Sequence, residues 1–304
     1  MGKAGEVIGW SAWQPLAGAP VLAPAVLAET LDGGQAFRWH RHDEHGWLGL
    51  WSGCVAHVRH GADGLLAWRA PFPLAARVAA ELPRYLALER DFTALTETLP
   101  WRSDDHLARC RAAFPGLRIL RQPFGETLLG FLCSATKQIV QIKQMLSLLA
   151  ERHGQPVADF PGAHALHRLP TWPELARIPE PELRACLLGF RARYIAQTAR
   201  FLAAHPGWLE ETEAAPYPLA KERLCSLPGV GEKIADCVLL FGAGRLEAFP
   251  VDTWILQALV RRYGLDGWKP AQVAQFGRAH FGPLAGLAQQ FLFAYERANR
   301  PTGN

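Results

Sequence analysis

Residues 224–252 read LCSLPGVGEKIADCVLLFGAGRLEAFPVD and carry the most informative pattern in the chain. The pattern predicts a helix that ends near Ser226, a tight hairpin at Leu-Pro-Gly-Val-Gly, and a second helix that begins near Glu232. Gly229 and Gly231 leave backbone N–H groups accessible at a helix N-terminus, where a phosphate can bind without a charged side chain. The stretch therefore indicates either a hairpin that binds DNA phosphates or an ordinary turn between two helices.

Lys233 and Asp252 are the two candidate catalytic residues of this stretch. Lys233 lies in the first turn of the second helix, where the helix dipole disfavours an ammonium, and partial burial there would lower the pKa of the amine and make it nucleophilic. Asp252 follows after one helix and a short return segment, so its carboxylate can lie near Lys233 and stabilise an oxocarbenium-like sugar. A lysine in a first turn is also a common surface residue, and an aspartate before a helix is a good N-cap. Both interpretations stay open on spacing alone.

The first third of the chain is predicted to be β-rich, and from about Pro73 onward the pattern becomes helical. Short aromatic or β-branched segments separated by turn residues indicate an antiparallel sheet, with strands at residues 36–39, 47–51, 55–58 and 65–68. Apolar periodicity predicts helices over 126–135, 138–153, 180–188, 192–204, 219–226, 232–242, 252–263 and 284–297, with connectors over 154–172 and 211–218. We expect an α+β protein with an antiparallel-sheet domain over residues 1–113 and a mostly helical helix-hairpin-helix domain over residues 114–304.

Composition narrows the class of protein without identifying it. The net charge of +4 permits a nucleic-acid partner but does not require one. No apolar run approaches the ~20 residues that span a bilayer, and the N-terminus lacks the apolar core of a signal peptide, so we expect a soluble intracellular protein. The cysteines are scattered singly, which fits buried free thiols better than a zinc or iron–sulfur site: Cys54, Cys110, Cys133, Cys186, Cys225 and Cys237.

The hairpin stretch resembles the helix-hairpin-helix glycosylases and, within them, the 8-oxoguanine DNA glycosylases. The family signature is the hairpin LPGVG, a lysine and a loop that ends in Val-Asp, here residues 227–231, Lys233 and Val251-Asp252. Further blocks follow in family order from about residue 30 to 295: GQAFRW at 34–39, LGFLCS at 129–134, GFRARY at 189–194, and Ala288-Gln289 followed by Phe293. The resemblance implies a bifunctional N-glycosylase and β-lyase in which Lys233 attacks C1′ of a flipped nucleotide, displaces 8-oxoguanine and forms a Schiff base.

The resemblance also implies a pocket for the flipped base. The main-chain carbonyl of Gly34 would accept the N7 proton that 8-oxoguanine carries and guanine lacks. Phe293 would stack on one face of the base, Cys237 would pack against the other, and Gln289 would reach the Watson–Crick edge. Phe241 stands where the animal-type pattern has a pocket methionine.

A second implied set of residues contacts the DNA around the flipped nucleotide. Phe190 resembles the wedge that enters the vacated stack, and Arg191 resembles the residue that hydrogen-bonds the orphaned cytosine. The animal-type pattern has an asparagine and a second arginine near that base, whereas this chain has Thr136 and Gln141, so we expect only a modest preference for cytosine. The remaining members of this set lie on the hairpin and after the aspartate, with a tryptophan in place of the family's histidine: Gly229, Gly231, Ile234 and Trp254.

The resemblance implies no required cofactor, and at most a structural monovalent cation at the hairpin, held by the main-chain carbonyls of Cys225, Leu227 and Val230. The expected partner is double-stranded DNA that contains 8-oxoguanine. The protein is expected to act as a monomer away from membranes, in the cytoplasm or nucleoid of a bacterium or the nucleus of a eukaryote.

Two alternatives stay open. A monofunctional alkylpurine glycosylase of the same superfamily would rely on the aspartate alone, and Lys233 and the GQAFRW block argue against it. A non-catalytic module would use the hairpin only to bind phosphates, and the joint presence of Lys233 and Asp252 argues against that.

Overall fold

The N-terminal part of the protein is built on an antiparallel sheet. The computed structural model describes residues 9–44, 46–61, 63–158 and 166–299. The five strands lie in the order β1 (Gln14–Pro15), β5 (Leu66–Arg69), β4 (Cys54–His60), β3 (Gly46–Trp51) and β2 (Trp39–Arg41), and every neighbouring pair is antiparallel. The predicted antiparallel meander is confirmed. The first predicted strand, 36–39, is wrong in its bounds: it begins only at Trp39, because the ring of Phe37 leaves the sheet to pack 5.2 Å from that of Phe131.

Helices cover this sheet and connect it to the rest of the chain. The helices of this part are α1 (Pro24–Asp32), α2 (Ala75–Tyr85), α3 (Phe92–Glu97) and α4 (Asp105–Ala113). Helix α2 contacts β4, and the Trp39 indole donates a hydrogen bond of 3.0 Å to the hydroxyl of Tyr85. No sequence pattern pointed to α1 or β1, since both are short and lie in a stretch rich in alanine and proline.

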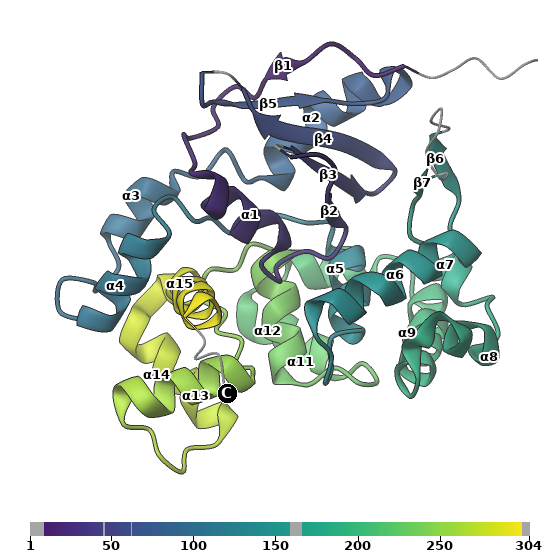
Figure 1. The fold of residues 1–304 in the computed structure, drawn as a ribbon. Helices are drawn as coiled ribbons and strands as arrows, with labels where there is room; N and C mark the ends of the chain where they lie inside the picture. Colours follow the sequence, from purple (N-terminus) through teal and green to yellow (C-terminus); the bar gives the residue numbers. More distant parts are fainter. Residues whose placement is uncertain (1–8, 45, 62, 159–165, 300–304) are drawn as a thin grey trace, which may run out of the picture.

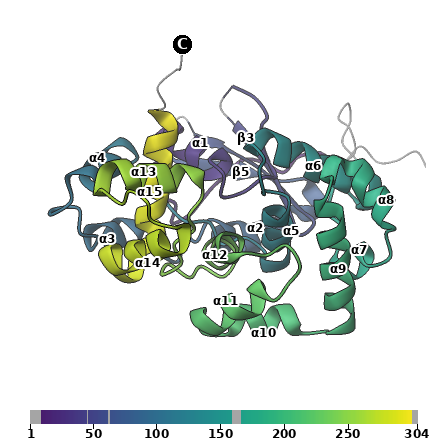
Figure 2. The same ribbon diagram turned by 90° about the horizontal axis from the view of Figure 1, so that it is seen from below.

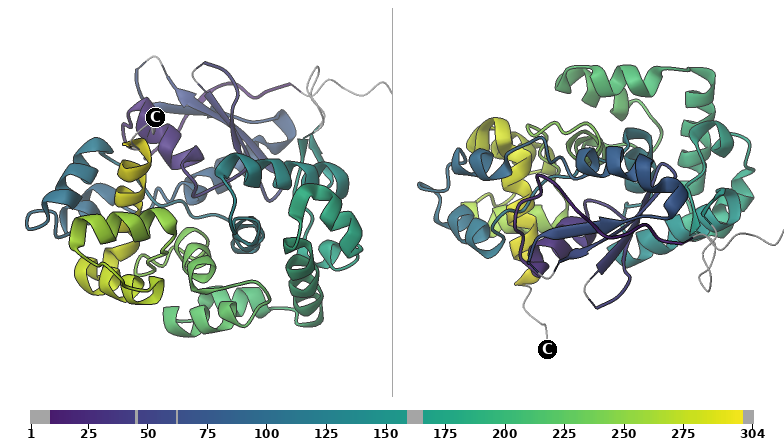
Figure 3. Two further views of the ribbon diagram at one scale, coloured as in Figure 1. Left: turned by 60° about the horizontal axis from the view of Figure 1, so that its bottom comes forward. Right: turned by 90° about the horizontal axis from the view of Figure 1, so that it is seen from above.

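The remainder is helical, so the predicted α+β class is confirmed. Its helices are α5 (Phe124–Leu132), α6 (Ile139–His153), α7 (Trp172–Leu175), α8 (Glu180–Leu183), α9 (Arg191–Ala204), α10 (Trp208–Ala214), α11 (Tyr217–Cys225), α12 (Glu232–Phe241), α13 (Thr253–Tyr263), α14 (Pro270–Phe281) and α15 (Ala285–Ala298). Helix α12 packs against α5 and α11, and α15 packs against α4, α13 and α14. Helix α11 also contacts α10 (Figure 2). Figure 3 (left) looks along α5, with α12 on one side of it, α9 on the other, and α6 above it in the view.

The structure corrects three boundaries of this helical part. The predicted helix over 180–188 stops at Leu183 and continues as a π-type turn, Arg184–Leu188, in which Leu187 has a φ of +62°. The predicted connector over 211–218 is wrong, because residues 208–214 form α10 and α11 begins at Tyr217. The connector over 154–172 contains a two-stranded ribbon, β6 (Pro156–Ala158) with β7 (Leu166–His167), and part of it lies outside the described residues.

Two further sequence expectations concern cysteines and membranes. The six cysteines are free thiols, and all are buried except the half-buried Cys225. None of the described helices has the length and apolar character that crossing a bilayer requires.

Candidate functional site

Lys233 lies where the start of α12 meets the end of α5. Its Nζ donates a hydrogen bond of 3.3 Å to the Ser134 hydroxyl and lies 5.1 Å from the centre of the Phe131 ring. The side chain is half-buried, not fully solvated. Ser134 and Phe131 were not among the predicted site residues, although both lie in the LGFLCS block. These contacts hold the amine at a defined place.

Cys237 lies one turn after Lys233 on α12. The thiol is buried and within hydrogen-bonding reach of the Lys233 amine. Burial raises the pKa of Cys237 to about 12, while the neighbouring lysine lowers it and the carboxylate of Asp252 raises it. The thiol is therefore protonated at neutral pH, which makes it an uncharged surface beside the amine rather than a second nucleophile.

Asp252 is the N-cap of α13. The backbone N–H of Ile255 donates a hydrogen bond of 2.8 Å to its Oδ1, and the N–H of Trp254 also contributes. Burial raises the pKa of Asp252, whereas these hydrogen bonds and the charge of Lys233 lower it. The carboxylate therefore lies close enough to Lys233 for the two charges to interact. The capping interpretation is confirmed, and the catalytic role of Asp252 stays a prediction that the cap does not exclude.

Gly34 lies between the start of α6 and the middle of α15. Its φ is +106°, and a Cβ there would lie 3.2 Å from Cδ1 of Ile139 and 3.6 Å from Cε1 of Phe293. The next residue fixes this loop: the buried amide of Gln35 donates to the Arg118 carbonyl at 2.8 Å and accepts from the Leu120 N–H at 3.0 Å. The structure thus brings together Gly34 and Phe293, two of the predicted pocket residues, and adds Ile139 to them.

Gln289 lies on α15, one turn before Phe293. The side chain is 4% exposed, and its Oε1 is buried without a hydrogen-bond partner among the described residues. A buried acceptor without a donor costs ~1–3 kcal/mol of stability. Such an atom is suited to a ligand that supplies the donor.

Phe241 is part of an aromatic stack behind the amine. Its ring lies 5.6 Å from that of Phe131 at an angle of 18°, and Phe131 is the ring that faces Lys233. Its backbone carbonyl accepts a hydrogen bond from Gln122 at 2.8 Å. Phe241 therefore supports the site through Phe131.

The structure also joins two of the predicted orphan-base residues. Arg191 is 3% exposed. Its Nη2 donates hydrogen bonds to the Ala135 carbonyl and, at 3.1 Å, to the Thr136 hydroxyl. Its Nη1 donates to the Leu188 carbonyl at 3.3 Å. Phe190, by contrast, is 51% exposed. The third predicted contact, Gln141, takes part in a capping box at the start of α6, where its side chain accepts a hydrogen bond of 3.1 Å from the N–H of residue 138.

The two hairpin glycines differ in their surroundings. Gly229 has a φ of +78°, and a Cβ on it would lie 2.5 Å from the ring of Tyr194 on α9. Gly231 is exposed, precedes α12 as its N-cap, and has no atom within 4 Å of a built Cβ. Gly231 therefore leaves room for an approaching phosphate, whereas Gly229 is required for the packing of the hairpin on α9. Of the other predicted DNA contacts, Ile234 is buried in the first turn of α12 and Trp254 is half-buried in the first turn of α13.

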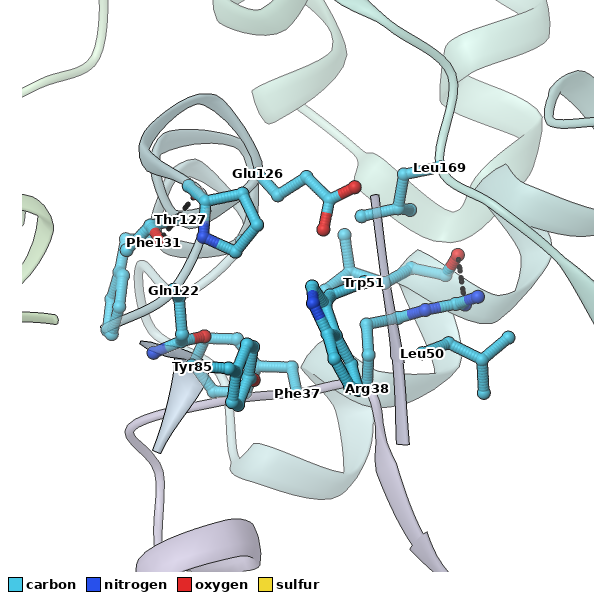
Figure 4. Close-up of a pocket in the computed structure, with 13 residues that line it drawn as sticks. Phe37, Arg38, Leu50, Trp51, Tyr85, Gln122, Glu126, Thr127, Phe131 and Leu169 are labelled. Carbon is cyan, nitrogen blue, oxygen red and sulfur yellow. Dashed lines mark hydrogen bonds between the residues drawn. The ribbon is translucent and has the colours of Figure 1, made fainter. Parts of the chain in front are cut away.

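Two cavities border α5, and Lys233 lines neither of them. Figure 4 shows the smaller, of about 20 Å³, between the sheet and α5, with the carboxylate of Glu126 directed toward it. Burial raises the pKa of Glu126, which accepts a hydrogen bond of 2.9 Å from the Ser52 N–H. The larger, of about 700 Å³, opens beside Trp172 and Trp208. The smaller cavity has room for a water molecule but not for a base.

Residues 22–128 match the family model for the 8-oxoguanine DNA glycosylase N-terminal domain. The N-glycosylase/DNA lyase OGG1 of Arabidopsis thaliana is 35% identical over 193 residues, which cover 60% of this chain and 52% of that protein. The probable N-glycosylase/DNA lyase of Methanothermobacter thermautotrophicus is 30% identical over 213 residues, which cover 64% of this chain and 68% of that protein. The chain thus spans about half the length of the plant relative.

Solved structures agree with these matches. The 8-oxoguanine glycosylase/lyase of Clostridium acetobutylicum, in complex with double-stranded DNA containing cytosine opposite 8-oxoguanine, superposes with a TM-score of 0.83 and 30% identity, over 90% of this chain and 92% of that one. The 3-methyladenine DNA glycosylase of Archaeoglobus fulgidus shares the fold, with a TM-score of 0.74 at 18% identity.

A hairpin between two helices, α11 and α12, within a fold common to these enzymes places the chain in the class of the helix-hairpin-helix DNA glycosylases. The archaeal and clostridial relatives are matched over more than two thirds of their own length at 30% identity. The chain belongs to the 8-oxoguanine DNA glycosylase family.

Proposed function

We propose that this protein is a bifunctional N-glycosylase and abasic-site lyase that removes 8-oxoguanine from double-stranded DNA. The observation that carries the proposal is the placement of Lys233 at the start of α12, where its amine is held by Ser134 and Phe131, with Cys237 one turn away and Asp252 near enough for its charge to interact. An amine held in a defined place, with a carboxylate near enough to interact with its charge, is an arrangement that suits nucleophilic displacement at a sugar carbon.

Recognition begins with extrusion of the damaged nucleotide, because the glycosidic carbon is inaccessible within a duplex. The exposed ring of Phe190 fills the space that the base leaves. The free acceptor of Gln289 then meets the N–H donors on the Watson–Crick edge of the base, and the carbonyl of Gly34 accepts the proton on N7. Guanine has a lone pair at N7, so the same carbonyl repels it.

The two flat faces of the base are covered by different kinds of group. Phe293 lies against Gly34 and stacks on one face. The protonated thiol of Cys237 packs on the other, on the side of the Lys233 amine. This sandwich places C1′ of the flipped nucleotide near the nucleophile.

The chemistry proceeds in two steps. The amine of Lys233 forms a bond to C1′ while the bond from C1′ to the base nitrogen breaks, and the base leaves with that electron pair and takes up a proton. Asp252 stabilises the positive charge that develops on the sugar and assists removal of the proton from the lysine. Ring opening gives a Schiff base, loss of a proton from C2′ expels the 3′ phosphate, and the strand is cut 3′ to the lesion.

The hairpin is proposed to hold the phosphate backbone, with a monovalent cation bound by the carbonyls of Cys225, Leu227 and Val230. The Leu227 carbonyl already accepts the Val230 N–H at 3.1 Å, but a carbonyl oxygen has a second lone pair for a cation. The cation would brace the hairpin and takes no part in bond breaking. No other cofactor enters the proposed reaction, and the protein acts as a monomer where chromosomal DNA lies, in a nucleoid or a nucleus.

The alternative of a monofunctional alkylpurine glycosylase shares the fold but not the need for a placed lysine. Likeness to the Archaeoglobus enzyme at 18% identity concerns the fold alone. The contacts that position Lys233 favour the lyase.

A denaturing gel separates these alternatives. A duplex with one 8-oxoguanine opposite cytosine is incubated with the protein, and each sample is divided and run with and without hot alkali. A bifunctional enzyme yields cut strands without alkali. Strands cut only after alkali would indicate a monofunctional glycosylase, and strands that stay intact under both conditions would indicate a non-catalytic module.

A further inference from the structure

The turn that precedes the wedge helix has an unusual backbone. Four residues other than glycine have positive φ among those described: Ser52, Ala87, Thr136 and Leu187. Ser52 lies in a two-residue hairpin, where positive φ is the normal geometry. A positive φ at Leu187 is unfavourable, because the branched side chain of leucine gains no local hydrogen bond in the left-handed region. Residues held in such conformations cluster at functional sites.

Exposure alternates sharply along this turn. Leu183, Cys186 and Leu188 are fully buried, whereas Leu187 is 52% exposed and Phe190 is 51% exposed. The left-handed φ of Leu187 is what turns its side chain out of the core between two buried neighbours. The turn therefore presents two large apolar side chains to solvent, three residues apart, at the start of α9.

Arg191 holds this turn in place. Its guanidinium lies 4.4 Å from the centre of the Phe190 ring and hydrogen-bonds the carbonyl of Leu188, which directly follows Leu187. The same guanidinium reaches the Ala135 carbonyl and the hydroxyl of Thr136, whose own φ is +56°. The buried Arg191 thus connects the two loops that contain Thr136 and Leu187. It holds the exposed pair, Leu187 and Phe190, against the loop that follows α5.

We propose that Leu187 is a second wedge residue, whose side chain enters the base stack beside Phe190 when the protein binds DNA. This inference rests on the proposed function, since it extends the way in which the damaged nucleotide is extruded. Leucine is one of the apolar side chains that unstack base steps and kink a duplex when they enter it. Insertion also buries the apolar surface that the free protein exposes and makes use of the conformation that the turn maintains.

The test measures unstacking next to the lesion. 2-Aminopurine is placed on either side of 8-oxoguanine, and its fluorescence is followed as protein is added, with Lys233→Gln in every sample so that no strand is cut. We expect Leu187→Ala to reduce the rise in fluorescence on one side of the lesion at least twofold, and to weaken binding of the lesion duplex about tenfold. Leu187→Met, which keeps a flexible apolar side chain, should restore both signals.

Two controls separate this role from a structural one. Leu187→Gly removes the side chain at a φ that glycine adopts freely, so its Tm should equal or exceed that of the parent protein while unstacking still falls. Leu65→Ala truncates a leucine that is 42% exposed outside the wedge turn and should change neither signal. Unchanged fluorescence in both Leu187→Ala and Leu187→Gly would overturn the proposal.

Failure of the proposed function would be visible separately. Protein with an intact Lys233 is incubated with a duplex that already contains an abasic site, under borohydride. Absence of an adduct there would reject the lyase proposal, whereas loss of unstacking in the Leu187 variants concerns the wedge alone.

Discussion

The hairpin between α11 and α12 and the turn between α8 and α9 both face the proposed DNA substrate, yet they are built in opposite ways. In the hairpin the left-handed position is occupied by a glycine, Gly229, and the helix that follows is regular. In the wedge turn the left-handed position is occupied by Leu187, and large apolar side chains stay exposed. A site that must hold reacting groups in fixed positions is built without backbone strain. A surface that must enter a base stack keeps exposed apolar groups in place by strain and a buried arginine.

In the hairpin region, the largest effect on activity should come from the replacement of Asp252 by asparagine. The variant keeps a side-chain oxygen that can cap α13 but loses the negative charge next to Lys233. We expect base release to slow by a factor on the order of 10² to 10³, while affinity for the damaged duplex changes little. Single-turnover excision and a binding titration measure the two quantities. A collapse of binding together with folding would show that Asp252 is chiefly a structural cap.

The charge on Asp252 also predicts the acidic limb of the pH profile. Burial raises the pKa of this carboxyl above its ordinary value, against the opposing influence of Ile255 N–H and Lys233. Only the ionised form stabilises a cationic sugar, so the rate is full above that pKa and declines as the pH falls through it. A rate profile measured below pH 7 should show its acidic inflection above the normal range of an aspartate. The same inflection in Asp252→Asn would assign it to another group.

A matched pair of glycine substitutions separates fold from DNA contact within the hairpin. Gly229→Ala places a Cβ 2.5 Å from the Tyr194 ring at a φ of +78°, which should lower the free energy of unfolding by about 2 kcal/mol or more. Gly231→Ala meets no atom within 4 Å, so stability should change by less than about 1 kcal/mol.

The DNA affinities of the same two variants should show the opposite order to their stabilities. The Cβ at Gly231 intrudes where a phosphate approaches, so we expect several-fold weaker binding to lesion and undamaged duplexes alike, measured across a salt series. Urea unfolding supplies the stability values. A loss restricted to lesion DNA would contradict phosphate binding at this glycine.

A further expected effect concerns the base opposite the lesion. Arg191 already uses its Nη donors on Ala135, Thr136 and Leu188, so a contact with cytosine exchanges one set of hydrogen bonds for another. The rate of excision opposite cytosine should exceed the rates opposite the other three bases. The difference should be no larger than one hydrogen-bonded contact provides, ~1–3 kcal/mol.

Arg191→Ala should remove most of that preference and also loosen the wedge turn, in single-turnover assays against all four partners. Activity confined to cytosine pairs would show that Thr136, Gln141 or another residue supplies further recognition.

Local motifs account for what the sequence predicted, and long-range packing accounts for what it missed. The hairpin, Lys233 and Asp252 lie within one continuous stretch whose turn residues and caps act on near neighbours. Ser134 and Ile139 reach the site from α5 and α6 through tertiary contacts, and neither residue type signals such a role.

The wedge turn shows the limit most clearly. Leu187 lies among residues with helical periodicity, which predicted a continuous helix over 180–188. Its left-handed φ follows from the packing of Leu188 and the contacts of Arg191, and no property of leucine indicates it.

The central claim is that Lys233 is the nucleophile, and borohydride trapping tests it most directly. The protein is incubated with a duplex containing 8-oxoguanine opposite cytosine under borohydride, and covalent adducts are resolved on a denaturing gel. Wild-type protein should form an adduct, because reduction fixes the Schiff base, and Lys233→Gln should form none while still binding the duplex. An adduct that persists in Lys233→Gln would place the nucleophile on another residue and contradict the account.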